Sequence, residues 1–148
     1  MKHFILTVWY SIIALTLAFT FNLLSCGWDD PCYRNFGVHT TNIVQIDRAE
    51  IKYDTLYSNQ TEEVLLWGTV GTNSGYTFKG IEAVRYLSSL DLTVWNSLDI
   101  PCGTTTKDTL LKLTGYTYYI TPPLTTGTNI VKVHQPNGSA ITLFFFVR

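Results

Sequence analysis

Charged residues are scarce in this chain of 148 residues: they make up 14 % of the sequence, against 46 % for apolar residues. Disordered chains show the opposite balance, so the composition predicts a folded protein. Basic residues are not in surplus either, because ten Lys and Arg stand against eleven Asp and Glu. This lack of positive charge argues against nucleic-acid binding and against a polybasic membrane patch.

The chain also lacks the short motifs that mark common active sites. Residues 71–75, Gly-Thr-Asn-Ser-Gly, have the wrong order for a nucleophile elbow, and no phosphate-binding glycine loop is present. His39 and His134 lie far apart in the sequence, and we interpret His134 as a solvated histidine at a strand end. No carboxylate pair has a spacing that suggests glycoside hydrolysis. The sequence therefore predicts no catalytic residue and a protein that is not an enzyme.

Signatures of a metal site are equally thin. Asp29-Asp30 would need Asp99 or Asp108, far along the chain, to bind calcium, and no Asp-rich calcium loop exists. Cys32 and Cys102 have neither the second cysteine pair nor the nearby histidines that zinc requires. We therefore expect no metal and no cofactor.

Aromatic residues, by contrast, are abundant at 14 % of the sequence. Together with the many threonines they favour strands. Some of them are candidates for a sugar- or peptide-binding face, although such residues are more often divided between core and sheet edge. The candidates are Trp28, Tyr33, Phe36, Tyr57, Tyr76, Tyr118 and Tyr119.

The most specific signal lies near the N-terminus. Lys2 and His3 precede an uncharged apolar run over residues 4–24, which ends in Leu23-Leu24-Ser25-Cys26. Two apolar residues, a small residue and then cysteine resemble the lipobox of bacterial lipoproteins. The resemblance covers residues 1–26. It implies cleavage before Cys26 and attachment of palmitate-type acyl chains to that residue.

Alternatives to the lipobox remain for this segment. The apolar run is long enough to stay as a transmembrane anchor, which needs about 20 residues. An ordinary signal-peptidase site fits less well, because Leu23 stands where a small residue is preferred. If Cys26 is lipidated, at least two acyl chains hold the mature chain on a membrane, since one chain binds only marginally.

The residues after Cys26 bear on the location of the protein. Gly27 stands where, in bacterial lipoproteins, an Asp implies retention at the inner membrane. Asp29-Asp30 resembles the acidic tag of surface-exported lipoproteins, with a solvated acidic tether as the alternative. We therefore expect a lipid-anchored cell-envelope protein, on the outer membrane, at its periplasmic face or the cell surface, rather than on the inner membrane.

Lipidation of Cys26 would leave Cys32 and Cys102 as a predicted disulfide, which an oxidising envelope permits. In the chain-entropy model a closed loop of roughly 70 residues stabilises a fold by about 4 kcal/mol. Two unpaired thiols are the alternative.

After Gly37 the sequence has the pattern of short strands. Residues 63–70 are apolar on both faces and predict a central strand. Residues 76–86 predict a strand with a bulge near Gly80, with a short helix over residues 80–90 as the alternative. Further along, Leu90, Leu92 and Val94 alternate with Asp91, Thr93 and Trp95, and residues 96–108 read as a loop.

Asn137-Gly138 stands between two alternating runs and predicts the last hairpin. In its second strand Phe144 and Phe146 lie on the face opposite Ile141 and Leu143. We therefore expect this strand to be covered on both faces or to lie at an interface.

Seven or eight such strands and no long helix predict an all-β fold, an antiparallel β-sandwich that follows an N-terminal signal helix. Residues 116–148, with Pro122-Pro123, a Thr-Gly turn and the last hairpin, resemble the last strands of immunoglobulin-like domains, and this resemblance implies an immunoglobulin-like β-sandwich. The tyrosine corner of that family is absent, since Asn129-Ile130 occupy its place, and a jelly roll or another sandwich is the alternative. An eight-stranded membrane barrel fits less well, because it needs strands of about ten residues.

The predicted organisation is a signal peptide over residues 1–25, a lipidated tether over 26–37 and a β-sandwich over 38–148. The predicted function is that of a membrane-anchored lipoprotein with a non-catalytic binding, adhesion or envelope-assembly role. Its expected partners are the membrane, through the lipid, and a protein or glycan ligand, but no nucleic acid. A small envelope hydrolase and a structural spacer are the alternatives.

Overall fold

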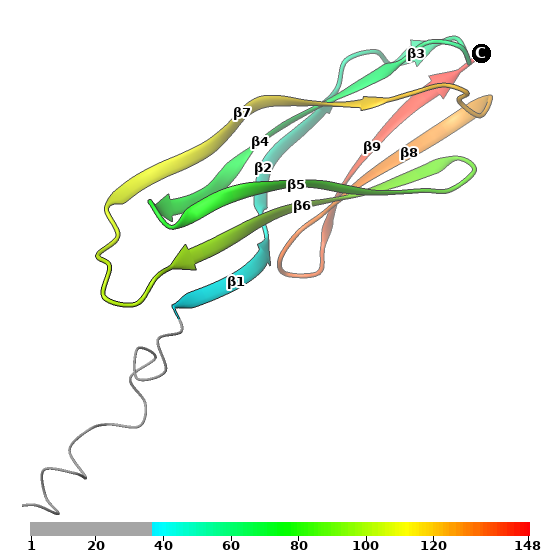
Figure 1. Cartoon of the computed structure of the whole chain (residues 1–148). Coiled ribbons are helices and arrows are strands. Elements are labelled where there is room, and N and C mark those ends of the chain that lie inside the picture. The colour runs from blue at the N-terminus through cyan, green and yellow to red at the C-terminus, as the bar shows by residue number, and fades with distance from the viewer. Residues whose placement is uncertain (1–36) are drawn as a thin grey trace, which may run out of the picture. The chain divides into compact units, whose positions relative to one another are not determined.

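Nearly the whole chain after Gly37 is extended. The computed structural model describes residues 37–148, and this part of the chain contains nine strands and no helix (Figure 1). The strands are β1 (Val38–Ile43), β2 (Gln45–Ile51), β3 (Thr55–Leu56), β4 (Glu62–Asn73), β5 (Tyr76–Arg85), β6 (Ser89–Ile100), β7 (Asp108–Ile120), β8 (Gly127–His134) and β9 (Ala140–Val147).

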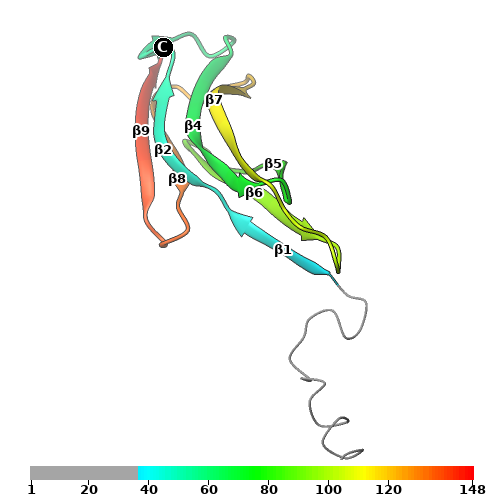
Figure 2. The same ribbon diagram turned by 90° about the vertical axis from the view of Figure 1, so that its left-hand side faces the viewer.

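The strands form two sheets that pack face to face (Figure 2). Sheet A runs β5-β6-β8-β9-β3, and β1 joins it by pairing with the last part of β6, in line with β8. Sheet B has three strands in the order β2-β4-β7. Sheet A has more strands than sheet B. Sheet B therefore covers the inner face of the outermost strands of sheet A only in part.

A single extended segment links the sheets at their N-terminal end. β1 pairs in sheet A and β2 pairs in sheet B, with only Val44 between them. The Val44 side chain is buried, and its N–H donates to the carbonyl of Val94 over 2.8 Å. The switch of sheet is therefore fixed by one apolar anchor and one hydrogen bond.

The core follows from strict alternation along the central strands. In β4 every second residue from Glu62 to Val70 is buried, and β6 and β8 alternate in the same way. Burial of one such aliphatic side chain contributes about 1.5–3 kcal/mol. The innermost side chains are Val44, Ile46, Val64, Leu66, Val70, Leu92, Val94, Val131, Val133 and Val147.

Two glycine bulges interrupt the pairing, one in each sheet. In β5 the register against β6 shifts between Phe78 and Gly80, and Gly80 has a φ of 132°. In β7 the register against β4 shifts at Gly115, which has a φ of 66°. Both values lie where side chains other than hydrogen are disfavoured. The predicted bulge near Gly80 is confirmed, and the alternative helix over residues 80–90 is wrong.

The predicted all-β sandwich is confirmed at the level of two packed sheets, as are the central position of β4 and the β8–β9 hairpin. The purely antiparallel arrangement is wrong at two places, since β6 with β8 and β3 with β9 pair in parallel. The predicted loop over residues 96–108 is too long, because β6 continues to Ile100. Asn96 is buried there and its side chain donates to the Val70 carbonyl, so its polarity does not mark a turn.

Candidate functional site

The predicted lipidation site and disulfide can be followed only in part. Cys26, Cys32, the signal peptide and nearly all of the tether lie outside the described residues. Cys102, two residues after the end of β6, is disulfide-bonded. Its pairing with Cys32 stays a prediction.

The aromatic candidates do not form a common face within residues 37–148. Tyr118 pairs with Val64 and Tyr119 with Glu63, so their side chains point to opposite sides of sheet B. Tyr57 is exposed in the turn after β3, while the ring of Tyr76 packs directly on Gly71. Trp28, Tyr33 and Phe36 lie outside the described residues.

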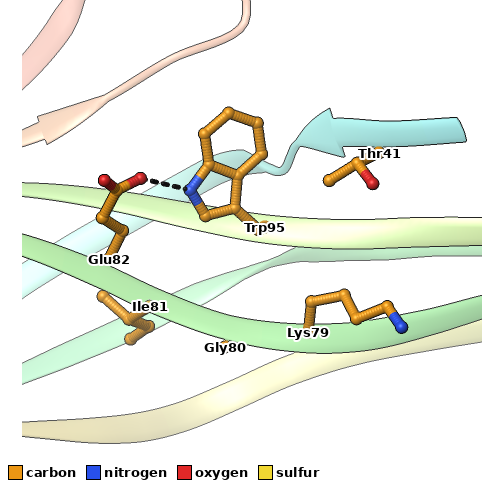
Figure 3. A pocket seen from close by; sticks show the side chains of 6 residues that line it. All are labelled: Thr41, Lys79, Gly80, Ile81, Glu82 and Trp95. Carbon is orange, nitrogen blue, oxygen red and sulfur yellow. Dashed lines mark hydrogen bonds between the residues drawn. The ribbon is translucent and has the colours of Figure 1, made fainter.

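A surface hollow lies elsewhere, on the outer face of sheet A, and has a volume of about 510 Å³ (Figure 3). Three strands meet there, because β6 pairs with β5 on one side and with β1 on the other. The lining residues are Thr41, Lys79, Gly80, Ile81, Glu82 and Trp95.

The bulge in β5 creates the space beside Trp95. Gly80 is the residue opposite Trp95 in the β5–β6 pairing, and apart from Gly80 itself and its two chain neighbours no atom lies within 4 Å of the place a Cβ on Gly80 would occupy. A hydrogen bond fixes the orientation of the Trp95 indole, because its N–H donates to Glu82 Oε2 over 3.0 Å. Figure 3 shows Glu82 on one side of the indole, with Thr41 and Lys79 on the other.

The hollow combines complementary chemical groups around one aromatic ring. Lys79 offers a cation and hydrogen-bond donors, Glu82 an acceptor, and Thr41 a hydroxyl that both donates and accepts. The ring of Trp95 supplies a flat apolar surface. Such a set suits a ligand that has polar groups on its rim and an apolar face.

A hydrogen-bonded chain lies next to the hollow. His39 precedes Thr41 by two residues on β1, so both point to the same face. His39 Nδ1 bonds to Asp99, Ser97 Oγ donates to the other oxygen of Asp99 over 3.2 Å, and Thr77 Oγ1 lies 2.8 Å from Ser97 Oγ. The bond with His39 is the main cause that lowers the pKa of Asp99 below 3.8.

This chain does not form a catalytic triad. In a Ser-His-Asp triad the imidazole bonds to the serine, whereas here both Ser97 and His39 bond to the carboxylate. Ser97 is also fully buried. His134 contacts Asp91, 3.3 Å away near the opposite end of β6, so the structure does not bring the two predicted histidines together.

A buried carboxylate that the sequence pattern did not reveal organises the far end of the domain. Glu62 is fully buried, and its Oε1 accepts the N–H groups of Lys52, Tyr53 and Glu63 at 3.2, 3.1 and 2.8 Å. Burial raises the pKa of Glu62 above 4.5, and these hydrogen bonds oppose the rise. Glu62 thus fixes the turn that follows β2, which is a structural role.

Residues 37–148 show neither a metal-binding cluster nor a membrane-spanning helix. No group of three or more His, Cys, Asp or Glu side chains in this region is arranged to hold a metal ion. The same residues contain no helix that is long and apolar enough to cross a membrane.

Comparison of the chain with family models, characterised proteins and solved structures gave no match. The candidate site therefore depends on its geometry alone. The sequence does carry one signal for it, which is a tryptophan on the polar face of an otherwise well-alternating strand, at Trp95.

Proposed function

We propose that this protein is a lipid-anchored component of the bacterial cell envelope whose β-domain binds glycans at the hollow around Trp95. The observation that carries the binding function is the Trp95 ring beside the empty space over Gly80, flanked by Lys79, Glu82 and Thr41. The role is that of a binding module rather than of an enzyme.

A saccharide fits this combination of groups. One face of a pyranose ring is lined by C–H groups and packs on an aromatic ring, while its hydroxyls need both donors and acceptors around the rim. The hollow supplies acceptors and donors through Glu82, Thr41 and Lys79. Its volume of about 510 Å³ falls within the range of about 300–1,000 Å³ that is usual for ligand sites.

The proposed anchor rests on the lipobox that ends at Cys26. Because β1 begins directly after Gly37, the proposed tether would enter the domain at the start of sheet A. The outer-membrane location rests on Gly27 and on Asp29-Asp30.

We further propose that the domain is a variant of the immunoglobulin-like sandwich. Supporting features are the three-stranded sheet β2-β4-β7, the early switch of sheet at Val44 and the C-terminal hairpin β8–β9. The parallel pairing of β6 with β8 is where the variant departs from an antiparallel arrangement.

Glycan binding is tested with the full-length protein in detergent micelles against a panel of neutral and acidic oligosaccharides, by isothermal titration. We expect at least one to bind, and Trp95→Ala to weaken it by about 100-fold, since stacking and rim contacts are lost together. The matched control is Trp67→Ala, which removes a half-buried tryptophan from the outer face of sheet B. Absence of binding at millimolar saccharide, or equal affinities in wild type and Trp95→Ala, would refute the proposal.

Anchoring is tested separately by metabolic labelling with palmitate in the wild type and in Cys26→Ala. We expect label in the wild type and its loss in the variant. If the unlabelled wild type still fractionates with the membrane, the apolar run over residues 4–24 is an uncleaved anchor instead.

A further inference from the structure

The outer face of sheet A carries a second exposed aromatic site in addition to Trp95. On β9, Phe144 is 57 % and Phe146 is 46 % exposed. All nine strands of residues 37–148 belong to the two sheets, and sheet B packs on the inner face of sheet A (Figure 2). No strand of this part of the chain therefore lies over Phe144 and Phe146, and both are open to a ligand.

The strand register places Phe144 on the same face of the sheet as Trp95. Along β6 the residues Leu90, Leu92 and Val94 point into the core, so Ser89 and Trp95 point outward. Ser89 lies opposite Ile130 of β8, and Ile130 lies opposite Phe144 of β9. Residues opposite each other in neighbouring strands share a face, so one ligand can contact both aromatic sites.

The same register gives the separation of the two sites. Ser89 precedes Trp95 by six residues on β6, which correspond to about 20 Å along the strand. Phe144 lies at the level of Ser89, two strands away, and each strand spacing adds about 4.8 Å across the sheet. A ligand that contacts both rings must therefore be longer than a disaccharide.

Polar side chains occupy the outer face between Trp95 and Phe144. They come from β6, β8 and β9, and each is exposed or half-buried. His134 Nε2 lies 3.3 Å from Asp91 Oδ2, whereas the ion pairs within residues 37–148 do not include Lys132. This polar strip offers both hydrogen-bond donors and acceptors. Its members are Asp91, Thr93, Lys132, His134 and Thr142.

This distribution fits a sugar chain better than a protein partner. Protein interfaces gather aromatic anchors at their centre and deplete charged residues there. Here the charged groups of Asp91 and Lys132 lie at the centre, and the aromatic rings lie at the two ends. A sugar chain carries hydroxyls along its whole length and presents the C–H faces of single rings for stacking, so it matches such a face.

We propose that the ligand of this face is an extended oligosaccharide, which fills the hollow at Trp95 and continues over the polar strip to stack on Phe144. The inference rests on the proposed glycan-binding function and adds the length of the ligand and a second contact site. A disaccharide reaches only the hollow. A longer chain engages both sites at once, and the second contact then forms at a high effective concentration.

The test is isothermal titration of the full-length protein in micelles with cello-, manno- and chito-oligosaccharides, from the disaccharide to the hexasaccharide. In at least one series we expect the hexasaccharide to bind at least tenfold more tightly than the disaccharide. Phe144→Ala should remove this gain and leave disaccharide binding unchanged, because Phe144 lies outside the hollow. Trp95→Ala should weaken the binding of both.

Two further variants serve as controls. Tyr119→Ala removes an aromatic side chain that is 58 % exposed, nearly the same as Phe144, but lies on the outer face of sheet B. It should bind every saccharide as the wild type does. Phe144→Tyr keeps an aromatic ring at the second site and should retain the gain with chain length.

The outcomes separate this inference from the proposed function. Equal affinities for disaccharide and hexasaccharide, or an undiminished gain in Phe144→Ala, would overturn the extended ligand and leave glycan binding at the hollow intact. Absence of binding by every saccharide would overturn both. Faster sedimentation of the wild type than of Phe144→Ala without saccharide would overturn the inference by assigning Phe144 to a contact with a second copy.

Discussion

The two tryptophans on the outer faces of the sheets stand in similar places. Trp67 in sheet B and Trp95 in sheet A each lie half-buried on a strand next to a glycine bulge, formed by Gly115 and Gly80 respectively. Both strands alternate between buried and half-buried residues up to these tryptophans, so each ring points away from the core. The same combination of residues therefore occurs once in each sheet.

The two sites differ in what fills the space around the ring. A Cβ on Gly115 would lie 3.5 Å from the Trp67 ring, and the Arg48 guanidinium lies 4.7 Å from the ring centroid, where it also bonds to Glu50. Around Trp95 the position over Gly80 is empty, and the cation–π contacts within residues 37–148 involve Trp67 and Tyr53 rather than this ring. Among the described residues, sheet B covers its tryptophan with its own arginine and sheet A leaves a hollow.

This difference separates a packing role from a binding role. An aromatic ring that is already covered by Arg48 gains little from a ligand, because its face is occupied by a cation–π contact. A ring such as Trp95, fixed by a hydrogen bond to Glu82 and bare on one side, is preorganised for a ligand. The comparison therefore predicts that Trp67 contributes mainly to stability and Trp95 mainly to binding.

The largest effect that tests this comparison is on stability. We expect Trp67→Ala to lower the free energy of unfolding by about 2–3 kcal/mol, because the ring loses its contacts with Arg48 and the Gly115 region. Trp95→Ala should lower the free energy of unfolding by only about 1 kcal/mol, because part of the Trp95 ring faces the hollow instead of packing against the protein. Urea unfolding of both variants measures the difference, and equal or reversed losses would contradict the division of roles.

A smaller effect is expected at the two bulges. Gly80→Ala places a side chain on a backbone with φ of 132°, so it should lower the free energy of unfolding by about 2 kcal/mol. The same substitution should also abolish glycan binding. Gly115→Ala, at φ of 66°, should lower the free energy of unfolding by about 1 kcal/mol and leave glycan binding unchanged. Thermal unfolding and titration of both variants give the two readouts. Retained binding in a folded Gly80→Ala would show that the hollow does not depend on its bulge.

Local patterns in the sequence were enough to predict most strands. The apolar run over residues 63–70 predicted the central strand β4, Asn137-Gly138 predicted the last hairpin, and Gly80 predicted a bulge. Gly115 shows the limit of such patterns, because a glycine between two apolar runs suggests a break, whereas the structure keeps one continuous β7. A bulge and a strand end use the same residue, and only the pairing with β4 distinguishes them.

Local patterns in the sequence could not predict the order in which the strands pair or the hollow around Trp95. The parallel contact of β6 with β8 depends on long-range packing and leaves no local signature. The hollow needs Thr41, Gly80 and Trp95 from three strands to meet. For the face of Phe144 and Phe146 the sequence predicted either a cover or an interface; both side chains are exposed within residues 37–148, so the described chain does not cover them and the interface stays a prediction.

The smallest expected effect is on the pH dependence of stability, and it contrasts the ion pairs of the two sheets. On sheet B, Arg48–Glu50 and Lys52–Glu63 contain no histidine, whereas on sheet A Asp99 is bonded to His39. The pKa of Asp99 is lowered in the folded state, so its ionised form supports the fold above pH 3.8. That support is lost as the pH falls through the lowered pKa.

We therefore expect His39→Ala to return the pKa of Asp99 towards 3.8 and to destabilise the protein slightly at about pH 5. The two stability curves should converge at lower pH, where Asp99 is protonated in both proteins. Carbon NMR of the Asp99 carboxyl measures the shift directly, and His134→Ala is the matched control because its imidazole contacts Asp91 instead. If Asp99 titrates identically in the wild type and in His39→Ala, the imidazole is not the cause of the lowered pKa, and the contrast between the two faces reduces to the tryptophans.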